Sequence, residues 1–445
     1  MNLKIYNTLS RKKEEFIPIK KGKVGMYVCG PTVNDVPHLG HARVQIVFDS
    51  FRKYLEYKGY EVNFVSNVTD IEDKIILKSN ELGISIKELT EKNLKEHLED
   101  YASLGVKKPT FQPRASEYVD EMISLIENLE KKGYIYVIES DGVYFDISKF
   151  KGYGKLSKIN LDELKNKRDL RDSSKGKDKK DSKDFVLWKF SKEGEPFWNS
   201  PWGKGRPGWH IECSAMSHKL LGLPFDIHAG GQDLIFPHHE DEIAQSEAGY
   251  GKKFVNYWMH NAMVNINKVK MSKSLKNFTT IKEILKDYEG EIIRYFTLNT
   301  HYRKPMDFSK EKLNEAKISL DKLRSLCKEV KPSKKDGRVY FELFEKEMNQ
   351  DFNTSGAINI IWRILREKED RGKYVFLKEI DLILGFGLFE ERKIKIPSKI
   401  KSLLSKREEA RKMKDFKLSD EIREEIRSLG FQVSDTKEGQ ELNKL

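Results

Sequence analysis

The 445-residue chain has little cysteine and no long apolar run. Its three cysteines, Cys29, Cys213 and Cys327, are too few for a disulfide framework. No stretch has the length and apolar character of a signal-peptide core or a membrane span. The sequence therefore predicts a cytoplasmic protein with reduced thiols and no membrane contact. It also lacks an obvious coiled coil or exposed apolar helix, so a monomer is expected.

Charge is abundant and unbalanced. Charged residues make up 34% of the chain, and the net charge is +12. A positive surface favours polyphosphate partners such as RNA because binding releases counterions from the nucleic acid. A lysine-heavy composition would give the same charge without any such partner. The charge is therefore consistent with RNA binding but does not establish it.

Near the start of the chain, a strand pattern runs directly into a helix pattern. Residues 24–30 form a short apolar stretch, and residues 42–55 carry apolar side chains at spacings of three and four. A helix N-terminus after a strand and a tight turn binds anions well, because its unpaired N–H groups and its dipole both favour phosphate. Gly40 lets a phosphate or adenine approach the backbone, and His38 and His41 can donate to phosphate oxygens.

A second motif, KMSKS, lies at residues 270–274 and supplies Lys270 and Lys273. Taken alone, such a lysine-rich loop is ordinary solvated surface. A lone pair such as His38 and His41 is likewise more often a surface pair or a metal site. Found together in this order, the two motifs predict a site that holds a nucleoside triphosphate and stabilises charge on its α-phosphate. Such chemistry requires no covalent nucleophile.

Two of the thiols lie beside candidate metal ligands. Cys29 ends the first strand pattern, and Cys213 falls between a Trp-His segment and a helix. His238 and Glu242 are four residues apart, which places both on one helix face. Two thiolates, an imidazole and a carboxylate would make a tetrahedral set suited to zinc. His239 is expected to point elsewhere, as a second-shell group.

These motifs resemble the HIGH and KMSKS signatures of class I aminoacyl-tRNA synthetases, with Leu39 in place of the usual isoleucine. Longer strings at residues 26–33, 208–216 and 236–246 are similar to those of cysteinyl-tRNA synthetases, and the similarity extends over essentially the whole chain. The resemblance implies activation of L-cysteine with ATP and Mg²⁺ to cysteinyl-adenylate. The amino acid then passes to the 3′ end of tRNA(Cys), and AMP and pyrophosphate are released.

The resemblance also assigns roles to individual residues. The zinc ligands of the family fall on Cys29, Cys213, His238 and Glu242, and the metal would select cysteine by its thiolate. The catalytic residues would be His38, His41, Lys270 and Lys273, with ATP bound by His38, Gly40, His41, Asp233 and Lys273. The cysteine pocket would include Cys29, Gly30, Thr69, Trp209 and His228. For Thr69, Asp233 and Trp209 the alternatives are a strand end, an ordinary turn and simple core packing.

The expected fold class is α/β, with a doubly wound, Rossmann-like parallel sheet interrupted by an insertion and followed by a helical bundle and a small C-terminal domain. The insertion is rich in helix signals and carries a charged tract at 172–181, which is either a solvated tether or a contact for the tRNA acceptor arm. The expected boundaries are 1–95 and 205–262 for the two catalytic halves, 96–204 for the insertion, 263–310 for the lysine loop and stem contact, 311–396 for the tRNA-binding bundle, and 397–445 for the anticodon-binding domain.

The sequence departs from the family at three places. Asn34 stands where an aromatic residue is usual, Lys276 stands where glycine is common, and the tail at 438–442 lacks a tryptophan that often follows. Three rival functions remain: a ligase joining cysteine to an amino sugar, a zinc hydrolase, and a non-catalytic RNA-binding descendant. The tail domain argues against the first, the four-ligand site against the second, and the intact histidine and lysine motifs against the third.

Overall fold

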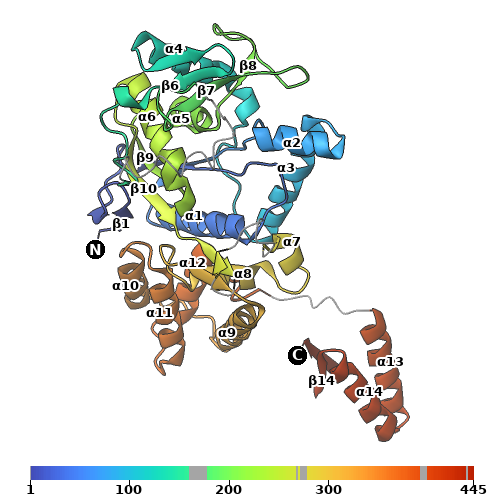
Figure 1. The fold of residues 1–445 in the computed structure, drawn as a ribbon. Helices are drawn as coiled ribbons and strands as arrows, with labels where there is room; N and C mark the ends of the chain where they lie inside the picture. Colours follow the sequence, from blue (N-terminus) through green and yellow to red (C-terminus); the bar gives the residue numbers. More distant parts are fainter. Residues whose placement is uncertain are drawn as a thin grey trace. The chain divides into compact units, whose positions relative to one another are not determined.

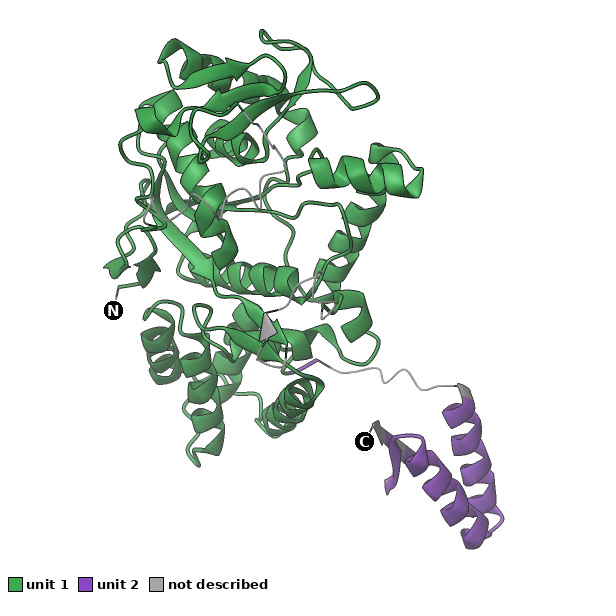
Figure 2. Ribbon diagram, viewed as in Figure 1, with its two compact units in different colours: residues 1–388 green, residues 389–445 purple. Residues whose placement is uncertain are grey.

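The computed structural model describes residues 2–159, 178–266, 269–270, 278–390, 398–436 and 439–444. The chain divides into two compact units, residues 1–388 and 389–445 (Figure 2). Most of the charged tract at 172–181 and of the KMSKS motif lies outside the described residues. The first unit contains all four predicted metal ligands.

A four-stranded parallel sheet forms the centre of the first unit. Its strands are β3 (Lys23–Val28), β4 (Glu61–Ser66), β9 (Phe225–Gly231) and β10 (Val255–Asn261), in the order β10-β9-β3-β4. Every residue of β9 is buried, as expected for a strand covered on both faces. The predicted doubly wound α/β fold is therefore confirmed.

Helices cover both faces of this sheet (Figure 1). Helix α1 (Leu39–Tyr57) packs on β4, β9 and β10, whereas α5 (Trp209–Leu221) packs on β3 and β4. The predicted amphipathic helix over 42–55 lies within α1. Helix α6 (Glu240–Tyr250) packs against α5. The carboxyl ends of parallel strands and the start of α1 thus face a common edge, which is where ligands bind in such folds.

The described residues between β4 and α5 include three α-helices and a second sheet. The helices are α2 (Asp73–Leu82), α3 (Ile86–Ser103) and α4 (Val119–Lys131). The strands, β5 (Ile135–Ile138), β6 (Gly142–Phe145), β7 (Phe185–Phe190) and β8 (Gly205–Pro207), form one antiparallel sheet. The sequence indicated helices in this segment. The strands were missed because they are short, and β6 pairs with a strand about forty residues further along the chain.

A short sheet and a series of helices complete the first unit. The sheet contains β11 (Val264–Ile266), β12 (Val269–Lys270) and β13 (Met306–Phe308). The helices are α7 (Ile281–Ile284), α8 (Gly290–Leu298), α9 (Lys310–Lys328), α10 (Arg338–Met348), α11 (Thr354–Arg366) and α12 (Lys373–Leu384). At the N-terminus, β1 (Lys4–Asn7) pairs with β2 (Lys12–Glu15).

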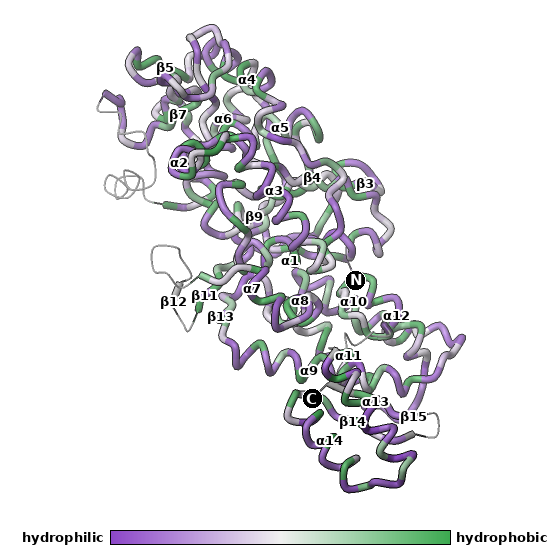
Figure 3. Tube along the Cα trace, turned by 90° about the vertical axis from the view of Figure 1, so that its right-hand side faces the viewer, coloured by the Kyte–Doolittle hydropathy of each residue, from purple (hydrophilic) through white to green (hydrophobic). Residues whose placement is uncertain are grey.

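The second unit has its own small core. Helices α13 (Ser398–Lys412) and α14 (Phe416–Ser428) pack with a hairpin of β14 (Phe431–Thr436) and β15 (Gly439–Lys444). Its buried apolar residues are Ile400, Leu403, Ile422, Ile426, Phe431 and Val433. Polar and apolar segments alternate along α9 and α14 in Figure 3. Among the described residues, no helix has the length and apolar character needed to cross a membrane.

Two buried arginines tie α1 to the rest of the first unit. Arg43 donates to the carbonyls of Ala262 and Met263 at 2.8 Å each, so α1 is joined to the segment that leads toward the lysine motif. Arg294 on α8 is 2.9 Å from Asp49 on α1 and also donates to the carbonyl of Leu384 at 2.9 Å. These contacts join the catalytic sheet to the helical region.

We expect Arg294→Met to destabilise the first unit by about 3 kcal/mol, because it leaves a buried carboxylate without its arginine partner. Arg338 is the control, since its ion pair with Glu342 has side chains that are 82% and 67% exposed. Arg338→Met should change stability by less than about 0.5 kcal/mol. Urea unfolding followed by circular dichroism measures both. Equal losses in the two variants would contradict the role given to Arg294.

Candidate metal centre and nucleotide site

Two thiols meet at the edge of the parallel sheet. Cys29 directly follows β3, and its N–H donates to the carbonyl of Ala229 on β9 at 3.0 Å. Cys213 lies on α5, and the two sulfur atoms are 3.8 Å apart. Both residues are buried, at 8% and 2% exposed. Residues separated by most of the sheet domain in sequence are thus adjacent in space.

The predicted imidazole and carboxylate complete the cluster. His238 is in the helical turn η5 (Ile235–His239), and Glu242 is in the first turn of α6. His238 Nε2 is 3.1 Å from Glu242 Oε1, which confirms that the spacing of four places both side chains on one face. One donor atom from each of Cys29, Cys213, His238 and Glu242 lies within 4.8 Å of every other.

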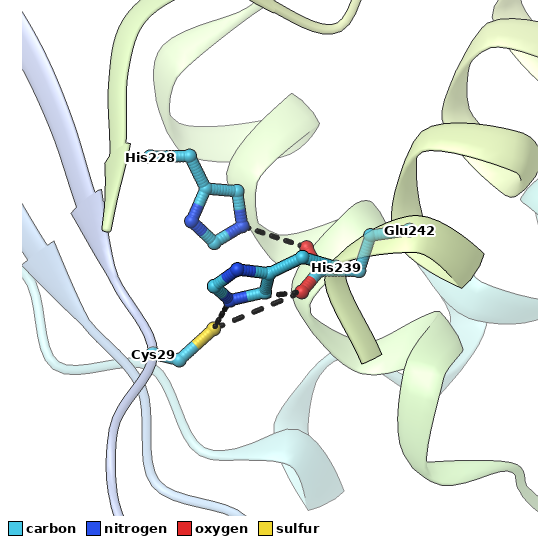
Figure 4. Close-up of side chains that lie close together, drawn as sticks. All are labelled: Cys29, His228, His239 and Glu242. Carbon is cyan, nitrogen blue, oxygen red and sulfur yellow. Dashed lines mark hydrogen bonds and ion pairs between the residues drawn. The ribbon is translucent and has the colours of Figure 1, made fainter. Parts of the chain in front are cut away.

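Two further histidines surround Cys29 and Glu242 (Figure 4). His239 Nε2 is 3.2 Å from Cys29 Sγ, so the expectation that His239 points elsewhere is wrong. The chain before α6 is kinked, because Phe236 has non-helical backbone angles, and this differs from the regular helix assumed from the sequence. His228 Nε2 is 2.8 Å from Glu242 Oε2. Cys29, His228, His239 and Glu242 therefore form a second set of donors that overlaps the first.

The buried charges stabilise one another. Burial disfavours the charge on Glu242, but His228 and His238 outweigh burial and lower its pKa to about 2. Burial opposes protonation of His238, yet the carboxylate of Glu242 raises its pKa to about 10. Burial likewise opposes the Cys213 thiolate, while hydrogen bonds from Cys29 and His238 lower its pKa to about 6. Burial raises the pKa of Cys29 well above its usual value.

This charge pattern fits a cation site. The lowered pKa of Glu242 and the raised pKa of His238 show that this cluster favours positive charge beside the carboxylate. A divalent cation would take over that charge and release protons, as metal binding to thiol and imidazole ligands requires. Two sulfurs, one nitrogen and one oxygen in a buried cluster suit zinc better than the oxygen-seeking magnesium or calcium. The residues present therefore fit the predicted metal.

A chain of hydrogen bonds extends behind His238. His210 Nδ1 is 2.9 Å from His238 Nδ1, and His210 Nε2 is 3.3 Å from Asp241 Oδ2. The hydroxyl of Tyr153 in turn donates to Asp241. Partners of this kind orient metal-binding imidazoles. Sequence reasoning gave no role to these residues. The available signal was that His210 lies three positions before Cys213 on the same helix, a spacing that makes the two side chains neighbours on the helix surface.

The histidines of the first motif are fixed at the start of α1. His38 is the N-cap residue, and its Nδ1 accepts a hydrogen bond from the N–H of Gly40 at 3.1 Å. His41 Nδ1 accepts from the N–H of His38 at 3.2 Å, and the two rings stack 3.9 Å apart. Because Nδ1 accepts in both rings, Nε2 is the protonated nitrogen when each imidazole is neutral. Each ring can therefore present an N–H donor at Nε2.

The described residues that follow the lysine motif contact the start of α1. Lys270 of β12 pairs through its backbone with Asn265 of β11, and Lys273 lies outside the described residues. Beyond the motif, the N–H of Leu39 donates to the carbonyl of Thr279 at 3.2 Å. The chain after the lysines thus returns to the N-terminus of α1, where the predicted phosphate site lies.

The residues predicted for the substrate pocket differ from one another in burial and in contacts. Trp209 begins α5, half-buried, with its ring centroid 4.3 Å from that of His238. Thr69 is buried and donates to Glu212 at 2.6 Å, a partner that sequence reasoning missed. Gly30 packs so tightly that a Cβ would lie 1.6 Å from the carbonyl oxygen of Asn67. His228 is fully buried behind Glu242, not at an open surface.

Asp233 lies apart from the buried cluster. It belongs to the short 3₁₀ turn η4 (Gln232–Leu234), which follows β9, and it is exposed. Cys327, the third cysteine, is buried on α9 in the helical region. The structure thus brings together Cys29, Cys213, His238 and Glu242 with Trp209 and His228, and places His38, Gly40 and His41 at the neighbouring helix start.

Two family models together match most of the chain. The model described as the class I (C) tRNA synthetase catalytic domain matches residues 15–318. The model described as the cysteinyl-tRNA ligase anticodon binding domain matches residues 395–442. The second match falls within the unit formed by residues 389–445.

Individual proteins give the same result. A cysteine-tRNA ligase from Thermococcus gammatolerans is 48% identical, with 99% of this chain and 98% of the relative covered. One from Bacillus pumilus is 44% identical over 99% and 98% of the two chains. Among solved structures, Mycobacterium tuberculosis methionyl-tRNA synthetase bound to methionyl-adenylate aligns with a TM-score of 0.60 at 14% identity, covering 86% of this chain and 94% of the other. That likeness shows a shared fold.

Proposed function

The chain belongs to the family of class I cysteine-tRNA ligases, and from this membership we propose how its own residues carry out the reaction. It is an ATP-dependent, AMP-forming enzyme that aminoacylates tRNA(Cys) with cysteine. The rest of this subsection concerns the metal, the adenylate step and the individual residues. The observation that supports the proposal most strongly is the buried cluster of two thiols, an imidazole and a carboxylate at the edge of the parallel sheet.

Cys29, Cys213, His238 and Glu242 hold one zinc ion per chain. This set is preferred over the overlapping set that contains His228 and His239, because two thiols bind a soft metal better than one. When bound, zinc supplies a thiophilic Lewis acid for the sulfur of the substrate. His210 and Asp241 orient His238 from behind, and His228 holds the second oxygen of Glu242.

Selection of cysteine over serine follows from the chemistry of this donor set. The two amino acids differ only in one atom, which is sulfur in cysteine and oxygen in serine. Shape and apolar contact distinguish such a pair only weakly. A site built around one specific polar interaction can reject an analogue that lacks it by about 10⁴-fold or more. No separate editing domain is then required. Gly30, Thr69, Trp209 and His228 shape the pocket around the substrate.

Adenylate formation takes place at the start of α1. A carboxylate oxygen of cysteine attacks the α-phosphorus of ATP, the bond from that phosphorus to the bridging oxygen breaks, and pyrophosphate leaves with Mg²⁺. His38 and His41 donate from Nε2 to the triphosphate, and Gly40 leaves room for it. Lys270 and Lys273 stabilise charge in the transition state, and Asp233 contributes to nucleotide binding. Catalysis is by positioning and electrostatics.

Transfer completes the reaction. A hydroxyl of the 3′-terminal ribose of tRNA(Cys) attacks the acyl carbon, and AMP leaves.

We assign the catalytic halves to 1–95 and 205–262, the insertion to 96–204, the lysine loop and stem contact to 263–310, tRNA contact to the bundle at 311–396, and anticodon contact to 397–445. The second unit exposes Phe416 at 61% and Met413 at 76% among lysines, which suits stacking with unpaired bases. The enzyme acts as a cytoplasmic monomer.

Metal removal tests this account. The purified protein should contain one zinc per chain, and dialysis against a chelator should abolish cysteine-dependent ATP–pyrophosphate exchange, which added zinc restores. Cobalt substituted for zinc should give thiolate-to-metal charge-transfer absorption. Full exchange activity in metal-free protein would show that the cluster is structural only.

A further inference from the structure

A groove lies between α9 and α11, away from the metal and nucleotide sites. It has a volume of about 440 Å³ and is lined by Ile318, Ser319, Lys322, Asn359, Trp362, Arg363 and Arg366. The α11 residues among these are spaced by three, four and seven positions, which places them on one face of the helix. We refer to these seven residues as the α9–α11 groove.

The groove is positively charged. Lys322, Arg363 and Arg366 are all exposed, and none forms an ion pair with a residue that the structure describes. No carboxylate is among the lining residues. Three unpaired cations lining one groove favour an anionic ligand, and guanidinium groups suit phosphate in particular.

The groove also has an apolar floor with a fixed aromatic ring. Trp362 is half-buried, and its Nε1 donates to the hydroxyl of Tyr295 on α8 at 3.2 Å. Ile318 is 67% exposed and adds apolar surface. Ser319 and Asn359 add hydrogen-bonding groups. An aromatic plane beside arginines and an amide matches the way proteins bind unpaired nucleotides.

We propose that the α9–α11 groove binds one unpaired nucleotide of the tRNA substrate. The base stacks on Trp362 and contacts Ile318, and the flanking phosphates bind Lys322, Arg363 and Arg366. A free nucleoside triphosphate fits less well, because the groove offers no carboxylate for its magnesium ion. This inference rests on the proposed tRNA charging. It adds a specific contact to the general expectation that the bundle lies against tRNA.

The charge part of the proposal is tested with Arg363→Glu and Arg366→Glu combined. The control combines Lys252→Glu and Lys253→Glu, which changes the net charge equally on exposed positions between α6 and β10, outside the bundle assigned to tRNA contact. The dissociation constant for a tRNA(Cys) transcript is measured by filter binding at several salt concentrations. The groove variant should bind at least about tenfold more weakly with a shallower salt dependence, and the control should bind within about twofold of the wild type.

The base contact is tested with Trp362→Leu, with thermal unfolding to verify the fold. Loss of stacking should weaken tRNA binding by about five- to tenfold or more. Cysteine-dependent pyrophosphate exchange should be unchanged in every groove variant, because the groove lies outside the adenylation site. A wild type that fails to exchange would overturn the proposed function instead.

Two results would overturn the groove proposal. The first is equal weakening by the groove variant and the Lys252→Glu, Lys253→Glu control, which would mean that only overall charge matters. The second is unchanged tRNA binding in all groove variants. If these variants bind tRNA normally but no longer bind AMP at a site other than the nucleotide site, the groove is a small-molecule site.

Discussion

Replacing Cys213 by serine is expected to remove zinc from the protein and to lower the rate of cysteine-dependent adenylate formation by about 10³-fold or more. Serine is nearly the same size, so the buried packing around α5 should survive. What is lost is one of two soft donors. Substitution of a residue that hydrogen-bonds to a metal ligand typically lowers metal affinity or activity by about 10- to 100-fold. Loss of a ligand itself should therefore have a larger effect. Metal analysis and ATP–pyrophosphate exchange measure the two effects.

Cys327 provides the matched control. It is the remaining cysteine and is buried on α9, where burial raises the pKa of its thiol to about 12 and makes it unreactive. Cys327→Ser should retain zinc and exchange activity. His239→Asn separates the two donor sets, because His239 belongs only to the set without Cys213. Retention of zinc by Cys213→Ser together with its loss in His239→Asn would show that the second set holds the metal.

The second large effect is expected at the nucleotide site. His38→Asn should lower the rate of adenylate formation by about 10²- to 10³-fold, corresponding to the loss of one donor to charge that develops on the phosphate. Asparagine is a favourable N-cap residue, so it can replace Nδ1 as the acceptor for the N–H of Gly40. The asparagine side chain is too short to place a hydrogen-bond donor at the position of Nε2. The KM for cysteine and the melting temperature should therefore change little.

His38→Gln gives the complementary result. Its amide extends toward the position of Nε2 but caps the helix poorly, so it should recover part of the rate while lowering stability. Pre-steady-state measurement of adenylate formation distinguishes the two variants. If both lose only stability and keep the wild-type rate, His38 serves only as a helix cap.

The sequence predicts those parts of the site that depend on local spacing. The placement of His38 and His41 at a helix start and the shared face of His238 and Glu242 follow from distances of a few residues, and the structure confirms both. The contact of His239 with Cys29 could not be predicted from local spacing, because the two residues are 210 positions apart in the sequence. Spacing alone did not establish that Cys29 and Cys213 would meet; the family resemblance supplied that assignment.

Long-range pairs escape sequence reasoning for the same reason. Thr69 and Glu212 are 143 positions apart, and nothing local to either indicates their hydrogen bond. The strands β5 to β8 are three to six residues long, so their patterns are weak beside the helix signals around them. The α9–α11 groove exists only because two separate helices pack together. The parallel, doubly wound character of the central sheet, by contrast, follows from the recognised fold.

Exchange of pyrophosphate into ATP, measured with cysteine and with serine on the zinc-loaded enzyme, tests the central claim most directly. Cysteine should support exchange at least about 10⁴-fold more efficiently than serine, as expected for a site whose donors select sulfur. The Cys213→Ser variant should lose the cysteine reaction without gaining one with serine. Comparable exchange with both amino acids in the wild type would contradict the claim that this cluster selects the substrate.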